Sequence, residues 1–203
     1  MNRFILLFIL PLVISSCKND QSGPGTVTSA ELSELSTTII HPDRLTIPAA
    51  CEMMTQEWIK ETLGLTLSDV SMVAADDPSN KNTKSCFFRW EDPATPNAGL
   101  FIQIMTNPVY DEFDKWISHF ITAKLTDGEV VLGNDEPYKY SKFETNGLNG
   151  VYSYDLKRFY WNLGNNYLFM LAFNMDIPEA KMVEHAKKMA AEINNNFSVK
   201  IKQ

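Results

Sequence analysis

The segment between residues 138 and 174 constrains the fold of this chain most strongly. Four short stretches rich in aromatic and β-branched residues follow one another there, at 138–144, 151–155, 159–163 and 167–174. The turns between them contain Asn and Gly, which tolerate the positive φ of tight hairpins. Strands joined by turns this short run antiparallel. We therefore expect successive hairpins in one antiparallel sheet.

Three stretches upstream extend the predicted sheet, at 67–75, 86–91 and 100–106. Side chains alternate along 86–91 with the period of a strand. One side carries Cys86, Phe88 and Trp90, and the other carries Phe87, Arg89 and Glu91. The stretch at 100–106 is the expected hairpin partner of 86–91.

Three segments have helical signals, at 56–63, 110–125 and 178–194. Thr55 is an expected N-cap and Gly64 an expected C-terminal glycine for the first. The other two have apolar stripes: Phe113, Trp116, Ile117, Phe120 and Ile121 in one, and Met182, Ala186, Met189, Ala190 and Ile193 in the other. We predict an α+β fold, a twisted antiparallel sheet of about six or seven strands with helices packed on it. A strand–strand–helix pattern occurs twice, either by duplication or as two instances of a common unit.

Residues 1–16 have the features of a signal peptide. One cation, Arg3, precedes an apolar run of 11 residues at 4–14, which is shorter than the roughly 20 residues of a membrane-spanning helix. Ile14, two serines and Cys17 follow, and this order resembles the lipobox of bacterial lipoproteins. We expect Cys17 to be lipidated and to anchor the protein in a membrane. The alternative is an ordinary secretory signal with an incidental cysteine.

The rest of the chain divides into two parts. Residues 17–40 are predicted to be the lipidated cysteine and a flexible tether, because few apolar side chains are present there to offset the entropy of ordering. Residues 41–203 are predicted to form a single α+β domain. The expected location is the bacterial cell envelope as a membrane-anchored lipoprotein, with the outer membrane favoured because Lys18, not Asp, follows Cys17. The periplasmic and the surface-facing orientation both remain open.

Two cysteines remain after Cys17. In an oxidising envelope compartment, Cys51 and Cys86 are expected to form a disulfide. A metal pair and a catalytic thiol are the alternatives, but no nearby histidine completes a zinc set.

The residues around these cysteines carry a resemblance. Cys51 is followed by two methionines, a threonine and a predicted helix that ends in Leu-Gly, and Cys86 begins a strand with Trp90 close by. This pattern resembles a class of uncharacterised bacterial envelope lipoproteins and extracytoplasmic sensor-type domains. The turn from Gly133 to Tyr138 is similar to the Gly-Asp-Glu-Ala-Tyr turn of that class, with an inserted Asn and with Pro in place of Ala. The resemblance implies an antiparallel α+β fold and a binding or sensing role, and it implies no catalytic residue.

The tyrosines are the candidate ligand-binding residues. Five of the seven fall in one short segment: Tyr138, Tyr140, Tyr152, Tyr154 and Tyr160. Tyr138 and Tyr140 are two residues apart, as are Tyr152 and Tyr154, so the members of each pair are expected to share one face of a strand. A tyrosine offers an apolar ring and a polar tip, which suits a ligand-binding face. The alternative is a packed sheet face beneath a helix.

Several functions are disfavoured. The net charge is −7 and the pI about 5.0, which argues against nucleic-acid binding. His41, His119 and His185 are scattered, are expected at the surface or its boundary, and show no catalytic or zinc spacing. The acidic loop at 76–82 lacks the glycine and the closing glutamate of a calcium loop, and solvated acids are also favoured at 127–136. We therefore expect neither a metal nor another cofactor.

The sequence thus predicts a lipid-anchored, non-catalytic binding or sensor module. Its partners would be the membrane, through Cys17, and a small molecule, a glycan or a protein. An envelope hydrolase with a non-local active site is one alternative, because catalytic residues need not be adjacent in sequence. A structural partner within an envelope complex is the other.

Overall fold

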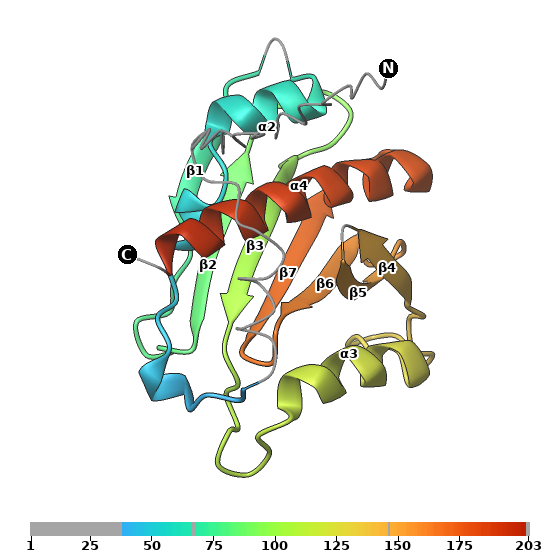
Figure 1. Ribbon diagram of the computed structural model, residues 1–203. Helices are drawn as coiled ribbons and strands as arrows, with labels where there is room; N and C mark the ends of the chain where they lie inside the picture. Colours follow the sequence, from blue (N-terminus) through green and yellow to red (C-terminus); the bar gives the residue numbers. More distant parts are fainter. Residues whose placement is uncertain (1–37, 66–67, 146, 202–203) are drawn as a thin grey trace, which may run out of the picture.

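The computed structural model describes residues 38–65, 68–145 and 147–201 (Figure 1). The strands of this part of the chain are β1 (Ser71–Ala74), β2 (Thr83–Arg89), β3 (Gly99–Met105), β4 (Ser141–Thr145), β5 (Leu148–Ser153), β6 (Arg158–Leu163) and β7 (Tyr167–Asn174). Its helices are α2 (Gln56–Leu63), α3 (Trp116–Thr126) and α4 (Glu179–Lys200), with short 3-10 turns η1 (Pro42–Arg44) and η2 (Ala50–Glu52).

The strands form one sheet of seven in the order β1-β2-β3-β7-β6-β5-β4, and every neighbouring pair is antiparallel. β3 and β7 are therefore the central strands, and they join the N-terminal hairpin to the C-terminal hairpins. This arrangement confirms the predicted antiparallel α+β fold and the predicted hairpin between β2 and β3.

One face of the sheet is covered by α4, α2 and η2 (Figure 1). The stripe predicted for the last helix is completely buried: Met182, Ala186, Met189, Ala190 and Ile193 are all 0% exposed. Trp161 donates from Nε1 to Asn194 Oδ1 at 3.0 Å, which ties β6 to α4. Pro178 is the N-cap of α4, one residue before the helical position that we expected for it.

α3 packs on the opposite face, over β5 and β6. It begins at Trp116, so the predicted start at residue 110 is wrong. Asn107 explains the delay, because its Nδ2 donates to the carbonyl oxygens of Phe113 at 2.7 Å and Asp114 at 3.2 Å. Its Oδ1 also accepts from the backbone N–H of Val109 at 2.9 Å. These bonds engage backbone groups that a helix would use, and the chain stays in turns up to α3.

The predicted disulfide is confirmed. The sulfurs of Cys51 and Cys86 are 2.03 Å apart, and the Cα atoms are 5.0 Å apart. The bond joins η2 to β2 on the face of the sheet that α4 covers.

The two strand–strand–helix units are β2-β3-α3 and β6-β7-α4. Their helices lie on opposite faces of the sheet. A two-fold axis perpendicular to the sheet would place both helices on the same face, so the units are not related in that way.

The predicted signal peptide, the lipidated Cys17 and most of the predicted tether lie outside the described residues. The described chain is already held to the domain at residues 38–40. The side chain of Asn166 donates to the carbonyl oxygen of Thr38 at 2.9 Å and accepts from the N–H of Ile40 at 2.8 Å. In the part of the chain that the structure describes, no helix has the length and apolar character needed to cross a membrane.

Candidate functional site

The five candidate tyrosines do not lie on one face of the sheet, and for two of them the alternative of a packed face beneath a helix holds. Tyr140 and Tyr160 are 7% and 6% exposed and pack beneath α3. Tyr152 lies on the opposite face, because it pairs in register with Phe159 whereas its neighbour Val151 pairs with Tyr160. Adjacent residues of a strand point to opposite faces, so Tyr152 and Tyr160 are separated by the sheet.

The remaining two tyrosines lie outside the strands. Tyr154 is at the turn after β5, where its hydroxyl donates to the carbonyl oxygen of Ile177 at 3.2 Å. Tyr138 forms an isolated bridge with Glu129 before β4. Tyr152 contacts α4 instead, donating to Glu179 at 2.9 Å, and this hydrogen bond together with burial raises the pKa of the phenol.

Glu129 organises the tyrosines beneath α3. Its carboxylate accepts from Lys124 Nζ at 2.6 Å, from the hydroxyl of Tyr140 at 2.6 Å and from Arg158 at 2.5 Å. Burial by itself raises the pKa of Glu129, but the hydrogen bonds and the two cations outweigh burial and hold this pKa below its usual value. Burial and the negative charge of Glu129 raise the pKa values of Tyr140 and Tyr160, so both phenols stay protonated.

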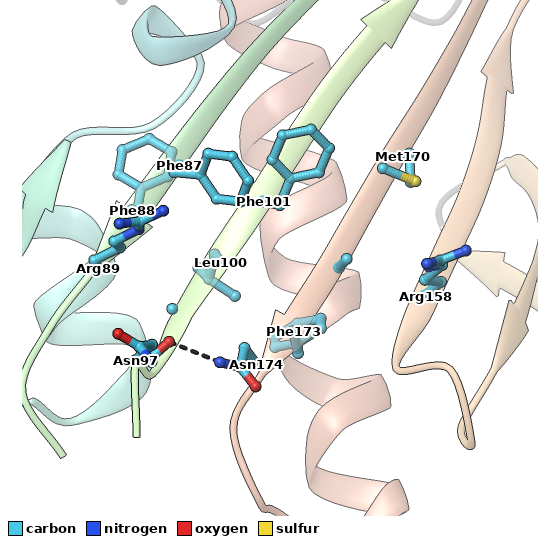
Figure 2. A pocket seen from close by; sticks show the side chains of 12 residues that line it. Phe87, Phe88, Arg89, Asn97, Leu100, Phe101, Arg158, Met170, Phe173 and Asn174 are labelled. Carbon is cyan, nitrogen blue, oxygen red and sulfur yellow. Dashed lines mark hydrogen bonds between the residues drawn. The ribbon is translucent and has the colours of Figure 1, made fainter. Parts of the chain in front are cut away.

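A groove lies beside this cluster, on the half of the same sheet face that α3 leaves bare. It has a volume of about 510 Å³ and crosses β2, β3, β7 and β6. Figure 2 shows its floor, where Phe87 and Phe101 lie side by side with ring centroids 4.4 Å apart. Met170 and Ala172 continue the floor toward β6. Val73 is 53% exposed and pairs with Phe87, so the apolar surface reaches β1.

Two asparagines close one end of the groove. Asn174 donates from Nδ2 to the carbonyl oxygen of Asn97 at 2.7 Å (Figure 2). Asn97 has a φ of 56°, in the left-handed region where asparagine is among the better-tolerated side chains. This contact fixes the turn that leads into β3 against the end of β7.

Two arginines reach the groove from opposite sides (Figure 2). Arg158 comes from β6 and pairs with Glu129, which also pairs with Lys124. Arg89 comes from β2, and its guanidinium lies 5.1 Å from the centroid of the Phe87 ring, a cation–π contact. The groove thus combines an apolar floor with positive charge at its edges.

The lining of the groove contains aromatic, aliphatic, amide and guanidinium groups, and it includes no carboxylate, imidazole, thiol or hydroxyl. Nucleophilic and acid–base catalysis both depend on such groups. The groove lining itself therefore supplies none of these groups.

The acidic residues of the loop at 76–82 make structural contacts. Asp76 accepts from the N–H of Ser85 at 2.7 Å and pairs with Lys84, and Asp77 accepts from Ser79. Among the residues that the structure describes, no group of three or more His, Cys, Asp or Glu side chains is placed to hold a metal ion.

His185 differs from the prediction. It is 6% exposed on α4, whereas we expected a surface or boundary position. Burial and the nearby charge of Lys181 lower its pKa, which favours the neutral imidazole.

Comparison with protein-family models, with curated proteins and with solved structures finds no match to this chain. The candidate site is therefore defined by its own geometry.

Sequence reasoning missed the groove, although one signal was present. The alternation in 86–91 placed Phe87 and Arg89 opposite the core-facing Cys86 and Phe88. Phe87 faces Phe101 across the β2–β3 hairpin, so this alternation was the sequence signal for an aromatic pair on the face opposite the core.

Proposed function

We propose that this protein is a non-catalytic binding module that takes a small, largely apolar molecule into the groove over β2, β3 and β7. The observation that carries the proposal is the half-buried aromatic floor formed by Phe87 and Phe101, on which no described helix packs, beside the half of the same face that α3 covers. A contiguous apolar surface of this kind is typical of a ligand-binding groove.

The size and chemistry of the groove support a small ligand. Pockets for small molecules have volumes of roughly 300–1,000 Å³ and apolar linings with a few polar groups, and this groove has about 510 Å³. The absence of acid–base groups from its lining favours binding over the hydrolase alternative.

We also propose that the module acts outside the cytoplasm, anchored through a lipid on Cys17. The disulfide between Cys51 and Cys86 supports this location, because disulfides persist mainly in oxidising compartments. Metabolic labelling with an alkyne fatty acid tests the anchor. The protein should be tagged and membrane-bound, and Cys17→Ala should remove both properties; a variant that is still tagged would contradict the assignment.

Binding in the groove is tested with N-phenyl-1-naphthylamine, a neutral apolar dye whose fluorescence rises in apolar surroundings. We expect the full chain to bind it, and Ala172→Trp to weaken this binding at least tenfold. Ala172 lies on the floor between Phe101 and Arg158, so an indole there fills the space without removing a core side chain.

The matched control is Ala180→Trp, which places the same side chain on the exposed start of α4. It should leave dye binding unchanged, and the melting temperatures of both variants should show that they fold. Equal binding by wild type and Ala172→Trp would contradict the groove as the binding site.

A further inference from the structure

We propose that the ligand of this groove is an anion: a small apolar molecule that carries a carboxylate or similar acidic group, which pairs with Arg89. This inference rests on the proposed function and specifies the ligand class of the same site.

The difference between the two arginines carries the proposal. Arg158 is held by Glu129 at 2.5 Å, so its guanidinium already has a carboxylate partner, which it shares with Lys124. Among the described residues, no ion pair within 4.0 Å involves Arg89. The chain as a whole has a net charge of −7, so this cation does not belong to a generally basic surface. Of the two arginines that line the groove, Arg89 is therefore the one whose guanidinium has no carboxylate partner among the described residues.

The position of Arg89 suits anion recognition. Its guanidinium rests over the ring of Phe87, with 5.1 Å between the guanidinium carbon and the ring centroid. Stacking of this kind restrains the guanidinium plane and leaves its N–H edge free. That edge can donate two parallel hydrogen bonds to a carboxylate or a sulfonate.

The apolar part of the ligand has a defined place. Phe101, Met170 and Ala172 extend from Arg89 toward Arg158. A molecule whose acidic group meets Arg89 would lay its apolar body on these side chains. At the far side it would meet Arg158, which already has its carboxylate partner in Glu129. The arrangement thus fits one acidic group at one end of an apolar body.

A matched pair of dyes tests this inference. 8-Anilino-1-naphthalenesulfonate has the skeleton of N-phenyl-1-naphthylamine with one added sulfonate. We expect the full chain to bind the sulfonate about tenfold more tightly than the neutral dye, because charge-assisted hydrogen bonds are stronger than neutral ones but are screened at an exposed site. Raising the salt concentration should reduce this preference.

Arg89→Met should abolish the preference, measured as the ratio of the two dye affinities in the same variant, since methionine keeps apolar contact with Phe87 but has no charge. Arg89→Lys should retain part of the preference, because it keeps the charge but loses the paired donors. Lys187→Met is the control for loss of one positive charge: this exposed lysine lies on α4 outside the groove lining, and its removal should change neither affinity.

The outcomes separate this inference from the proposed function. If Ala172→Trp binds both dyes as wild type does, the groove is not the site and the proposed function fails. If the neutral dye binds in the groove but the sulfonate binds no more tightly, only the anionic ligand class is overturned. Preference that survives Arg89→Met, or that is lost in Lys187→Met, would also overturn the role of Arg89.

Discussion

The two halves of one sheet face differ sharply in this protein. Over β5 and β6, α3 covers Val151 and Tyr160, and Glu129 joins the helix to the sheet through three hydrogen bonds. Over β2 and β3, the equivalent positions are Phe87 and Phe101, and no described helix packs on them. Both halves carry aromatic side chains, so residue type alone does not decide which half a helix covers.

The course of the chain explains the difference. α3 follows β3 in sequence but packs on β5 and β6, on the far side of β7. On the face opposite Phe87 and Phe101, the hairpin of β2 and β3 packs against the core under α4 and is joined to η2 by the Cys51–Cys86 disulfide. The described contacts that hold this hairpin therefore lie on the face that α4 covers, and no described helix packs on the opposite face.

The largest expected effect tests whether the stability of the β2–β3 hairpin depends on the disulfide. Removing the disulfide with Cys51→Ala and Cys86→Ala should lower the free energy of unfolding by about 4 kcal/mol, because the open loop gains entropy in the unfolded chain. Urea denaturation measures this change, and reduction of the wild-type protein should reproduce it. A loss below about 1 kcal/mol would show that the hairpin does not depend on this bond.

A pair of aromatic truncations compares the halves directly. Tyr160→Ala should lower the free energy of unfolding by about 3–4 kcal/mol, because it opens a cavity beneath α3. Phe101→Ala should cost about 1 kcal/mol, because its ring is half-buried and borders open space. Equal costs in urea denaturation would mean that the groove is part of the core.

The Glu129 cluster gives the next largest effect. Glu129→Gln should lower the free energy of unfolding by about 2 kcal/mol near neutral pH, because Lys124 and Arg158 lose their common counter-charge in a partly buried site. Glu144→Gln on the exposed edge strand β4 is the control and should change stability little.

The same variant has a defined pH dependence. The folded pKa of Glu129 lies below that of the unfolded chain, so its ionised form stabilises the fold. The difference between wild type and Glu129→Gln should be constant above about pH 5 and should shrink as the pH falls through the folded pKa. A difference that grows in acid would contradict the assigned direction.

The smallest effect concerns a single hydroxyl. Tyr140→Phe should cost about 1.5 kcal/mol, because the hydroxyl donates to a charged carboxylate. The matched variant Tyr154→Phe removes an exposed hydrogen bond to a backbone carbonyl and should cost about 0.5 kcal/mol or less. Equal values would indicate that the Glu129 cluster is no more stabilising than a surface contact.

Much of the secondary structure could be predicted because its signals are local. The bounds of α2 and β7 agree with the structure residue for residue, since Thr55 caps the helix and Gly64 ends it at a φ of 71°. The start of α3 could not be predicted from its apolar spacing, because the side chain of Asn107 competes for the backbone several residues away.

By itself, the sequence determined the strands and their alternation, the stripe of α4 and the two cysteines available for a disulfide. These depend on the spacing of residues along the chain and on the period of each element. Only the tertiary structure decided which faces are covered. The path of α3 buried Tyr140 and Tyr160 and left Phe87 and Phe101 half-buried, with no described helix over them. Among the described residues, it also gave Arg158 but not Arg89 a carboxylate partner. A period of two distinguishes the two faces of a strand, but which elements pack on each face depends on contacts between residues far apart in the chain.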